Sequence, residues 1–129
     1  MKPDVLVIEP DITLFAIADR RLHERFNLLW APTPEAAMTA LRKLGFDAVL
    51  VRAEEIALIA RLRKEHPTLP LIAVAPWEVQ GDRAVENGAH DWVSSPINFP
   101  RLAAVLVFAI AEAHREARRE PGPLVHAPA

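Results

Sequence analysis

The sequence contains no cysteine and no tyrosine among its 129 residues, and it has only four glycines. The lack of cysteine excludes disulfides, thiolate nucleophiles and cysteine-ligated metal sites. So few glycines argue against the glycine-rich loops that bind nucleotide phosphates. The formal net charge of -2 is too small for a nucleic-acid-binding face, so we expect no nucleic-acid partner.

Long apolar runs and metal-ligand spacings are also missing. No apolar stretch reaches the roughly 18–20 residues that span a bilayer, so we expect no membrane partner. The amino terminus leads straight into a strand pattern, which predicts no signal peptide and a cytoplasmic location. The five histidines lie in different predicted elements and predict no metal site, and we expect no cofactor. Ser94 and Ser95 have no paired base nearby, which argues against a serine nucleophile.

The composition is that of a single globular domain. Hydrophobic residues make up 51% and charged residues 25% of the chain. We expect one domain over residues 1–120, and the prolines beyond it predict a flexible tail over 121–129.

A short apolar run, Ala48 to Val51, is central to the sequence. A continuous run with two β-branched residues is typical of a parallel strand covered by helices on both faces. Arg52 follows it and places a positive charge at the carboxyl end of the strand, where open α/β sheets bind their ligands.

Strand and helix patterns alternate along the whole chain. The predicted strands are residues 5–8, 26–30, 46–52, 69–75 and 91–94. The predicted helices are residues 11–24, 33–44, 54–65, 79–87 and 99–119. Helix 11–24 should bury Ile12, Phe15, Ala16 and Leu22. Helix 33–44 should bury Ala37, Leu41 and Leu44, and helix 54–65 should bury Ile56, Ile59, Ala60 and Leu62. Five strand–helix units predict a three-layer α/β domain with a parallel sheet.

This order resembles the receiver domain of bacterial two-component response regulators over roughly residues 4–119. Residues 69–74 and 88–96 are similar to the family's "PIIxLT…GAxDYLxKP" segment. Residues 46–51 resemble its "YDLVLLD" strand, and residues 5–9 its "ILVVDD" opening. The resemblance implies a flavodoxin-like (βα)5 fold with the strand order 2-1-3-4-5.

The residues that carry phosphorylation in this family are not present at the matching positions. The acidic pair that holds Mg²⁺ reads Glu9-Pro10, and the phosphoacceptor aspartate falls on Arg52. The switch Ser/Thr falls on Ala75 and the phosphate-binding lysine on Ser95. A guanidinium cannot become an acyl phosphate, and it repels a divalent cation. We therefore expect a degenerate pseudo-receiver without phosphotransfer, although Asp47 or Glu54 remains as an alternative phosphoacceptor.

Arg52 and Glu9 should meet at the same edge of the sheet, because the implied strand order makes their strands neighbours. We hypothesise an internal ion pair between them, for which bidentate geometry is one option, with Asp11 close by. The alternative is that Arg52 simply points to solvent.

The family's switching pair also changes. With Ala75 in place of the hydroxyl, we expect Trp92 to be fixed rather than to act as a gate. The resemblance further implies a cis bond between Ser95 and Pro96.

The last predicted helix carries ten consecutive apolar residues, Leu102 to Ala111. They cover its whole circumference, whereas packing on a sheet needs only one stripe. The excess residues Val105, Val107 and Phe108, with help from Trp77, Trp92 or the first helix, predict a homodimer through this helix. The alternative is a terminal helix whose apolar residues are simply exposed.

Two functions are consistent with these patterns. The first is a non-enzymatic, phosphorylation-independent receiver-like signalling module that acts by dimerisation or by contact with an unidentified signalling protein. The second is a sensor of a small molecule or cofactor, which would bind in the crevice at the carboxyl ends of the strands.

Overall fold

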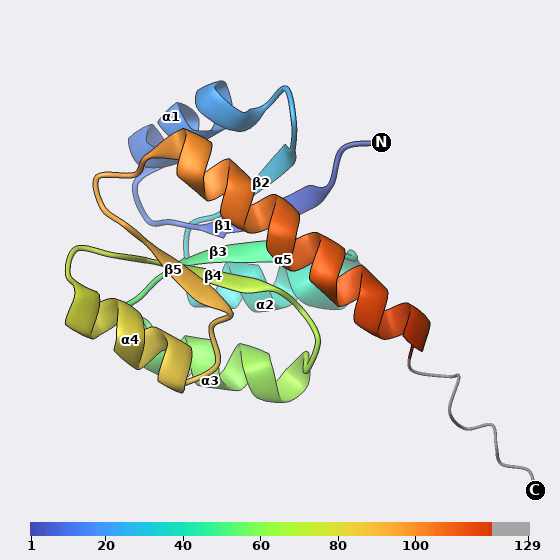
Figure 1. Cartoon of the computed structure of the whole chain (residues 1–129). Helices are drawn as coiled ribbons and strands as arrows, with labels where there is room; N and C mark the ends of the chain where they lie inside the picture. Colours follow the sequence, from blue (N-terminus) through green and yellow to red (C-terminus); the bar gives the residue numbers. More distant parts are fainter. Residues whose placement is uncertain (120–129) are drawn as a thin grey trace, which may run out of the picture.

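Five parallel strands form the centre of the protein (Figure 1). The structure is a computed structural model and describes residues 1–119, so the predicted tail over 121–129 lies outside the described residues. The strands are β1 (Asp4–Ile8), β2 (Asn27–Ala31), β3 (Ala48–Arg52), β4 (Leu71–Ala75) and β5 (Asp91–Ser94). They pair in the order β2-β1-β3-β4-β5, so the predicted fold class and strand order are confirmed.

Helices cover both faces of the sheet (Figure 1). They are α1 (Ile12–Leu22), α2 (Pro34–Lys43), α3 (Ile56–Glu65), α4 (Glu78–Glu86) and α5 (Phe99–Arg119). Side chains of β3 alternate between the faces: Val49 and Val51 pack with α2, α3 and α4, whereas Ala48 and Leu50 pack with α1 and α5. These four residues are at most 4% exposed, which explains why the central strand has no polar position before Arg52.

The helix ends follow the expected chemistry. The Asp11 carboxylate accepts a hydrogen bond from the Thr13 N–H at 2.8 Å, and the Thr33 hydroxyl accepts one from the Ala36 N–H at 3.1 Å. Gly88 follows α4 with a φ of 129°, in the left-handed region that glycine tolerates best.

Several predicted core positions were wrong. Ile12 and Leu44 are 53% and 52% exposed, and Ala16 and Ala60 are also exposed. Leu44 is the C-cap of α2 and has an extended backbone, so the helical period no longer applies to it. In α1 the buried positions are Ala18 and Leu22, and in α3 Leu58 takes the place predicted for Ala60; Met38 of α2 is buried as well. Helical periodicity indicates that a buried stripe exists, but the neighbouring elements decide how each helix is rotated.

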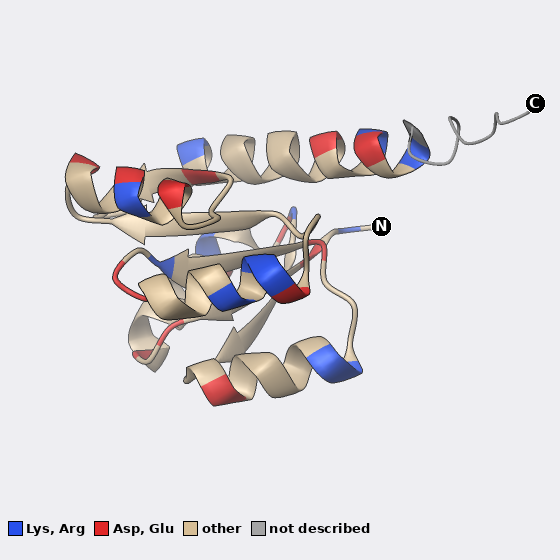
Figure 2. Ribbon diagram, turned by 90° about the horizontal axis from the view of Figure 1, so that it is seen from below, with Lys and Arg blue, Asp and Glu red and all other residues tan. Residues whose placement is uncertain are grey.

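α5 is the longest helix and leaves part of its apolar surface exposed. Its central section carries no charge, and apart from Arg101 near its start, its acidic and basic residues gather toward its carboxyl end (Figure 2). Phe108 is 62% and Val107 44% exposed, whereas Val105 is half-buried against the core. Within residues 1–119, no helix is both long enough and apolar enough to cross a membrane.

Arg63 of α3 joins three segments at the amino-terminal side of β4 and β5. Its guanidinium donates hydrogen bonds to the backbone oxygens of Gly88, His66 and Pro67, at 2.8–3.0 Å. Nη2 lies 3.2 Å from Nδ1 of His90, which must accept because arginine can only donate. Burial, and next the charge of Arg63, lowers the pKa of His90, in keeping with a neutral ring.

We expect Arg63→Met to lower the free energy of unfolding by about 1–3 kcal/mol, because three carbonyl oxygens lose a charged donor. Urea denaturation measures the change. Arg61→Met on the same helix is the control. It removes only an exposed pair with Glu65, at 2.9 Å, and should cost about 0–1 kcal/mol. Equal losses in the two variants would contradict the structural role of Arg63.

Candidate functional site

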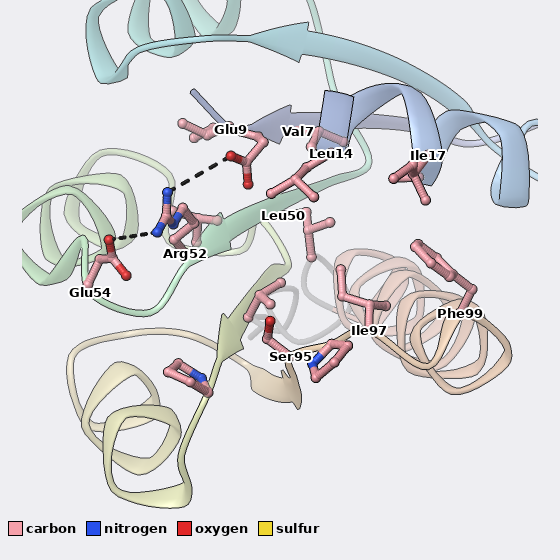
Figure 3. Close-up of a pocket in the computed structure, with 16 residues that line it drawn as sticks. Val7, Glu9, Leu14, Ile17, Leu50, Arg52, Glu54, Ser95, Ile97 and Phe99 are labelled. Carbon is pink, nitrogen blue, oxygen red and sulfur yellow. Dashed lines mark ion pairs between the residues drawn. The ribbon is translucent and has the colours of Figure 1, made fainter. Parts of the chain in front are cut away.

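The carboxyl ends of β1 and β3 bring Glu9 and Arg52 together, as their neighbouring strands require (Figure 3). Nη1 of Arg52 lies 3.9 Å from Oε2 of Glu9, and Nη2 lies 3.0 Å from Oε2 of Glu54. The Arg52 side chain is 40% exposed, compared with 13% for Glu9 and 60% for Glu54. One guanidinium therefore lies between two carboxylates, one sheltered and one open to solvent.

The predicted Arg52–Glu9 pair is present, but it is neither bidentate nor deeply buried. Its single contact is longer than a hydrogen bond. The closer partner, Glu54, was missed because that residue was assigned to the start of the third helix. In the structure α3 begins only at Ile56, and a turn directs Glu54 back toward Arg52. The available signal in the sequence was the spacing of Arg52 and Glu54, two opposite charges that lie two residues apart directly after a strand.

Glu9 is held in place by one backbone donor and one side-chain donor. Its Oε2 accepts the Asp11 N–H at 3.0 Å, and its own carbonyl accepts the Trp30 indole N–H at 2.7 Å. Asp11 was expected beside Arg52, but its carboxylate is turned to cap α1. Pro10 lies between the two acids and is exposed.

Ala75 and Ser95 complete the predicted pocket. Ala75 ends β4 and is fully buried, and its carbonyl accepts the Ser95 N–H at 2.9 Å. The Ser95–Pro96 bond is cis, as the resemblance implied. Among residues 1–119, no group of three or more acidic or histidine side chains could hold a metal ion.

A cavity of about 520 Å³ opens beside these residues. Its apolar wall is formed by Leu14 and Ile17 of α1, Leu50 of β3, Ile97 before α5, and Phe99 at the start of α5 (Figure 3). Its polar part is formed by Glu9, Arg52, Glu54 and Ser95. The sequence placed a crevice at this edge but did not reveal its apolar wall.

The predicted interaction residues do not form one patch. Val105 and Phe108 border a second hollow of about 420 Å³ beside β5, together with His90, Asp91, Arg101 and Glu112. Val107 and Trp77 do not line this hollow, although Trp77 is 67% exposed at the start of α4. Trp92 is half-buried, and its indole packs so closely over Gly81 of α4 that a Cβ there would overlap it.

Comparison with known proteins supports the class that this fold and site suggest. No family model matches the chain. The transcriptional regulatory protein ZraR of Escherichia coli K12 is 29% identical over 119 residues, which cover 86% of this chain and 27% of ZraR. The chain thus spans about a quarter of the length of the curated relatives it matches.

Solved structures show the same fold. A response regulator from Thermotoga maritima is 25% identical with a TM-score of 0.78, covering 86% of this chain and 99% of that chain. The receiver domain of the Francisella response regulator 1452 is 17% identical with a TM-score of 0.79, covering 86% and 98%. The fold is thus the flavodoxin-like fold of CheY-like proteins. The chain is thus similar in fold to response regulator receiver domains and in sequence to a quarter-length segment of ZraR.

We expect the coupling between Arg52 and Glu54 to be small, about 0.2–1 kcal/mol, because both side chains are substantially exposed. A double-mutant cycle of Arg52→Ala and Glu54→Gln, measured by urea denaturation, gives this energy, and added salt should reduce it. The exposed Arg61–Glu65 pair serves as the reference. A coupling of about 3 kcal/mol or more would indicate a buried ion pair instead.

Proposed function

We propose that the chain is a phosphorylation-independent receiver-type signalling module that acts through protein contacts and not as an enzyme. The main support is Arg52, which occupies the position that the family resemblance assigns to the phosphoacceptor aspartate. Its guanidinium stays protonated and cannot act as a nucleophile. Its charge also disfavours a divalent cation beside Glu9.

The alternative acceptors named by the sequence are poorly placed. Asp47 precedes β3 and lies at the opposite end of that strand, where its carboxylate accepts the Asp4 N–H at 2.8 Å. Glu54 is paired with Arg52. Within residues 1–119, neither carboxylate belongs to a group of three or more acidic or histidine side chains that could hold a metal ion.

The surroundings also favour a single conformation. Ala75 has no hydroxyl that could follow a phosphoryl oxygen. Trp92 is packed over Gly81, where α4 and β5 meet. A module of this kind would present one constant surface to its partners.

We expect acetyl phosphate with Mg²⁺ to leave the intact mass of the protein unchanged, because the last residue of β3 is Arg52 and not a residue with a carboxylate. A receiver domain with a complete set of phosphorylation residues is the positive control in the same mass-spectrometric assay. A phosphate adduct that maps to Asp47 or Glu54 would contradict phosphorylation independence.

Self-association through α5 is the second part of the proposal. Phe108 is 62% exposed and lies with Val105 between the basic Arg101 and the acidic Asp91 and Glu112. Two copies related by a twofold axis can bury the apolar centre and bring Arg101 toward an acid of the other copy. A stable interface buries about 800 Å² per partner, so exposed apolar residues outside this hollow, such as Val85 of α4, which packs on β5, would have to contribute.

We expect Phe108→Glu to shift the protein from dimer to monomer at micromolar concentration. A buried aromatic anchor of this kind contributes about 2 kcal/mol or more. Analytical ultracentrifugation measures the effect. Leu44→Glu, at an exposed leucine that caps α2 on the opposite face of the sheet, should leave the association unchanged. A monomeric wild-type protein would contradict this part of the proposal.

A further inference from the structure

We infer that the 520 Å³ cavity at the carboxyl ends of β1, β3 and β4 is a binding site for a small molecule. The ligand class is an uncharged, largely apolar compound that carries one hydroxyl group. The cavity is within the range of about 300–1,000 Å³ that small-molecule sites occupy. The inference does not depend on dimerisation and concerns a different surface from the α5 hollow.

The first argument is the apolar wall. Leu14 and Ile17 of α1 are 51% and 45% exposed, and both face the same space as Ile97 and Phe99 (Figure 3). Exposed apolar residues scattered singly need no explanation, but Leu14 and Ile17 share one hollow with the half-buried Ile97 and Phe99, so the four side chains form a single apolar wall. An apolar ligand body would remove these side chains from water.

The second argument is the polar end of the cavity. Nη1 of Arg52 donates and Oε2 of Glu9 accepts, and their 3.9 Å separation is too long for a direct hydrogen bond. A hydroxyl group between them can accept from the guanidinium and donate to the carboxylate at the same time. A hydrocarbon without a polar group leaves this pair without such a bridge.

The third argument is charge. Arg52 carries one positive charge, whereas Glu9 and Glu54 together carry two negative charges, so the polar end has a net charge of -1. A carboxylate or phosphate would meet Glu9 in a sheltered position, where repulsion is weakly screened. The site therefore selects against anions, in contrast to a phosphate-binding pocket.

The test uses three probes with the same ring system: 2-naphthol, 2-naphthoate and naphthalene. Titrations followed by ¹⁵N–¹H correlation spectra should show saturable 2-naphthol binding that shifts the amides of Leu14, Ser95 and Ile97. The dissociation constants of 2-naphthoate and naphthalene should be at least about tenfold higher than that of 2-naphthol. This is the size of effect expected from repulsion of the anion or from a lost polar contact. Glu9→Gln should narrow the gap between 2-naphthol and 2-naphthoate, because it removes one negative charge.

Leu14→Lys should abolish 2-naphthol binding. Leu44→Lys, at an equally exposed leucine directly after α2, should leave it intact; dispersed spectra verify that both variants are folded. Any of four results would overturn the inference: no saturable binding, shifts confined to other residues, equal affinity for the anion, or wild-type binding by Leu14→Lys. It would also be overturned if raising the protein concentration alone shifted the same amides, because a second copy would then occupy the cavity.

Discussion

Burial of the parallel sheet on both faces is the constraint on which the rest of this structure depends. Ala48 to Val51 contact helices on either side, so β3 can carry a polar side chain only where it emerges from between the layers. Arg52 is the first residue at which this occurs, and the neighbouring β1 brings Glu9 to the same edge. The fold therefore determines where the charges lie, and the residue types determine the chemistry available there.

Much of the fold could be predicted because short apolar runs in the sequence indicate the buried strands. Their spacing and the capping residues located all ten elements to within a few residues, and the β5 and α5 bounds agree with the prediction. The sequence predicted less well how each helix is rotated about its axis, that is, which of its residues are buried. Ile12 and Leu44 fit a helical stripe in the sequence, but the neighbouring segments leave them exposed. A period of 3.6 residues identifies a face without specifying what covers it.

The candidate site was predicted in position but not in detail. Arg52 and Glu9 could be paired from the strand order alone, because parallel strands end at one edge. The contact with Glu54 depends on a turn that delays the start of α3, and propensity locates helix starts only to within a few residues. The cavity was hidden for a different reason. Its wall combines α1 with the segment before α5, and residues so distant in sequence become neighbours only through packing.

The guanidinium at the carboxyl end of β3 affects the character of the whole pocket and not only the charge at one position. A receiver pocket built from several carboxylates must attract a cation, and that requirement keeps the pocket polar and hydrated. Here Arg52 partly neutralises the acids that remain, so the surroundings need not attract a metal ion. Apolar residues such as Leu14 and Ile97 can then line the same edge at little electrostatic cost. The guanidinium at this edge and the apolar cavity beside it are thus compatible features of the same pocket.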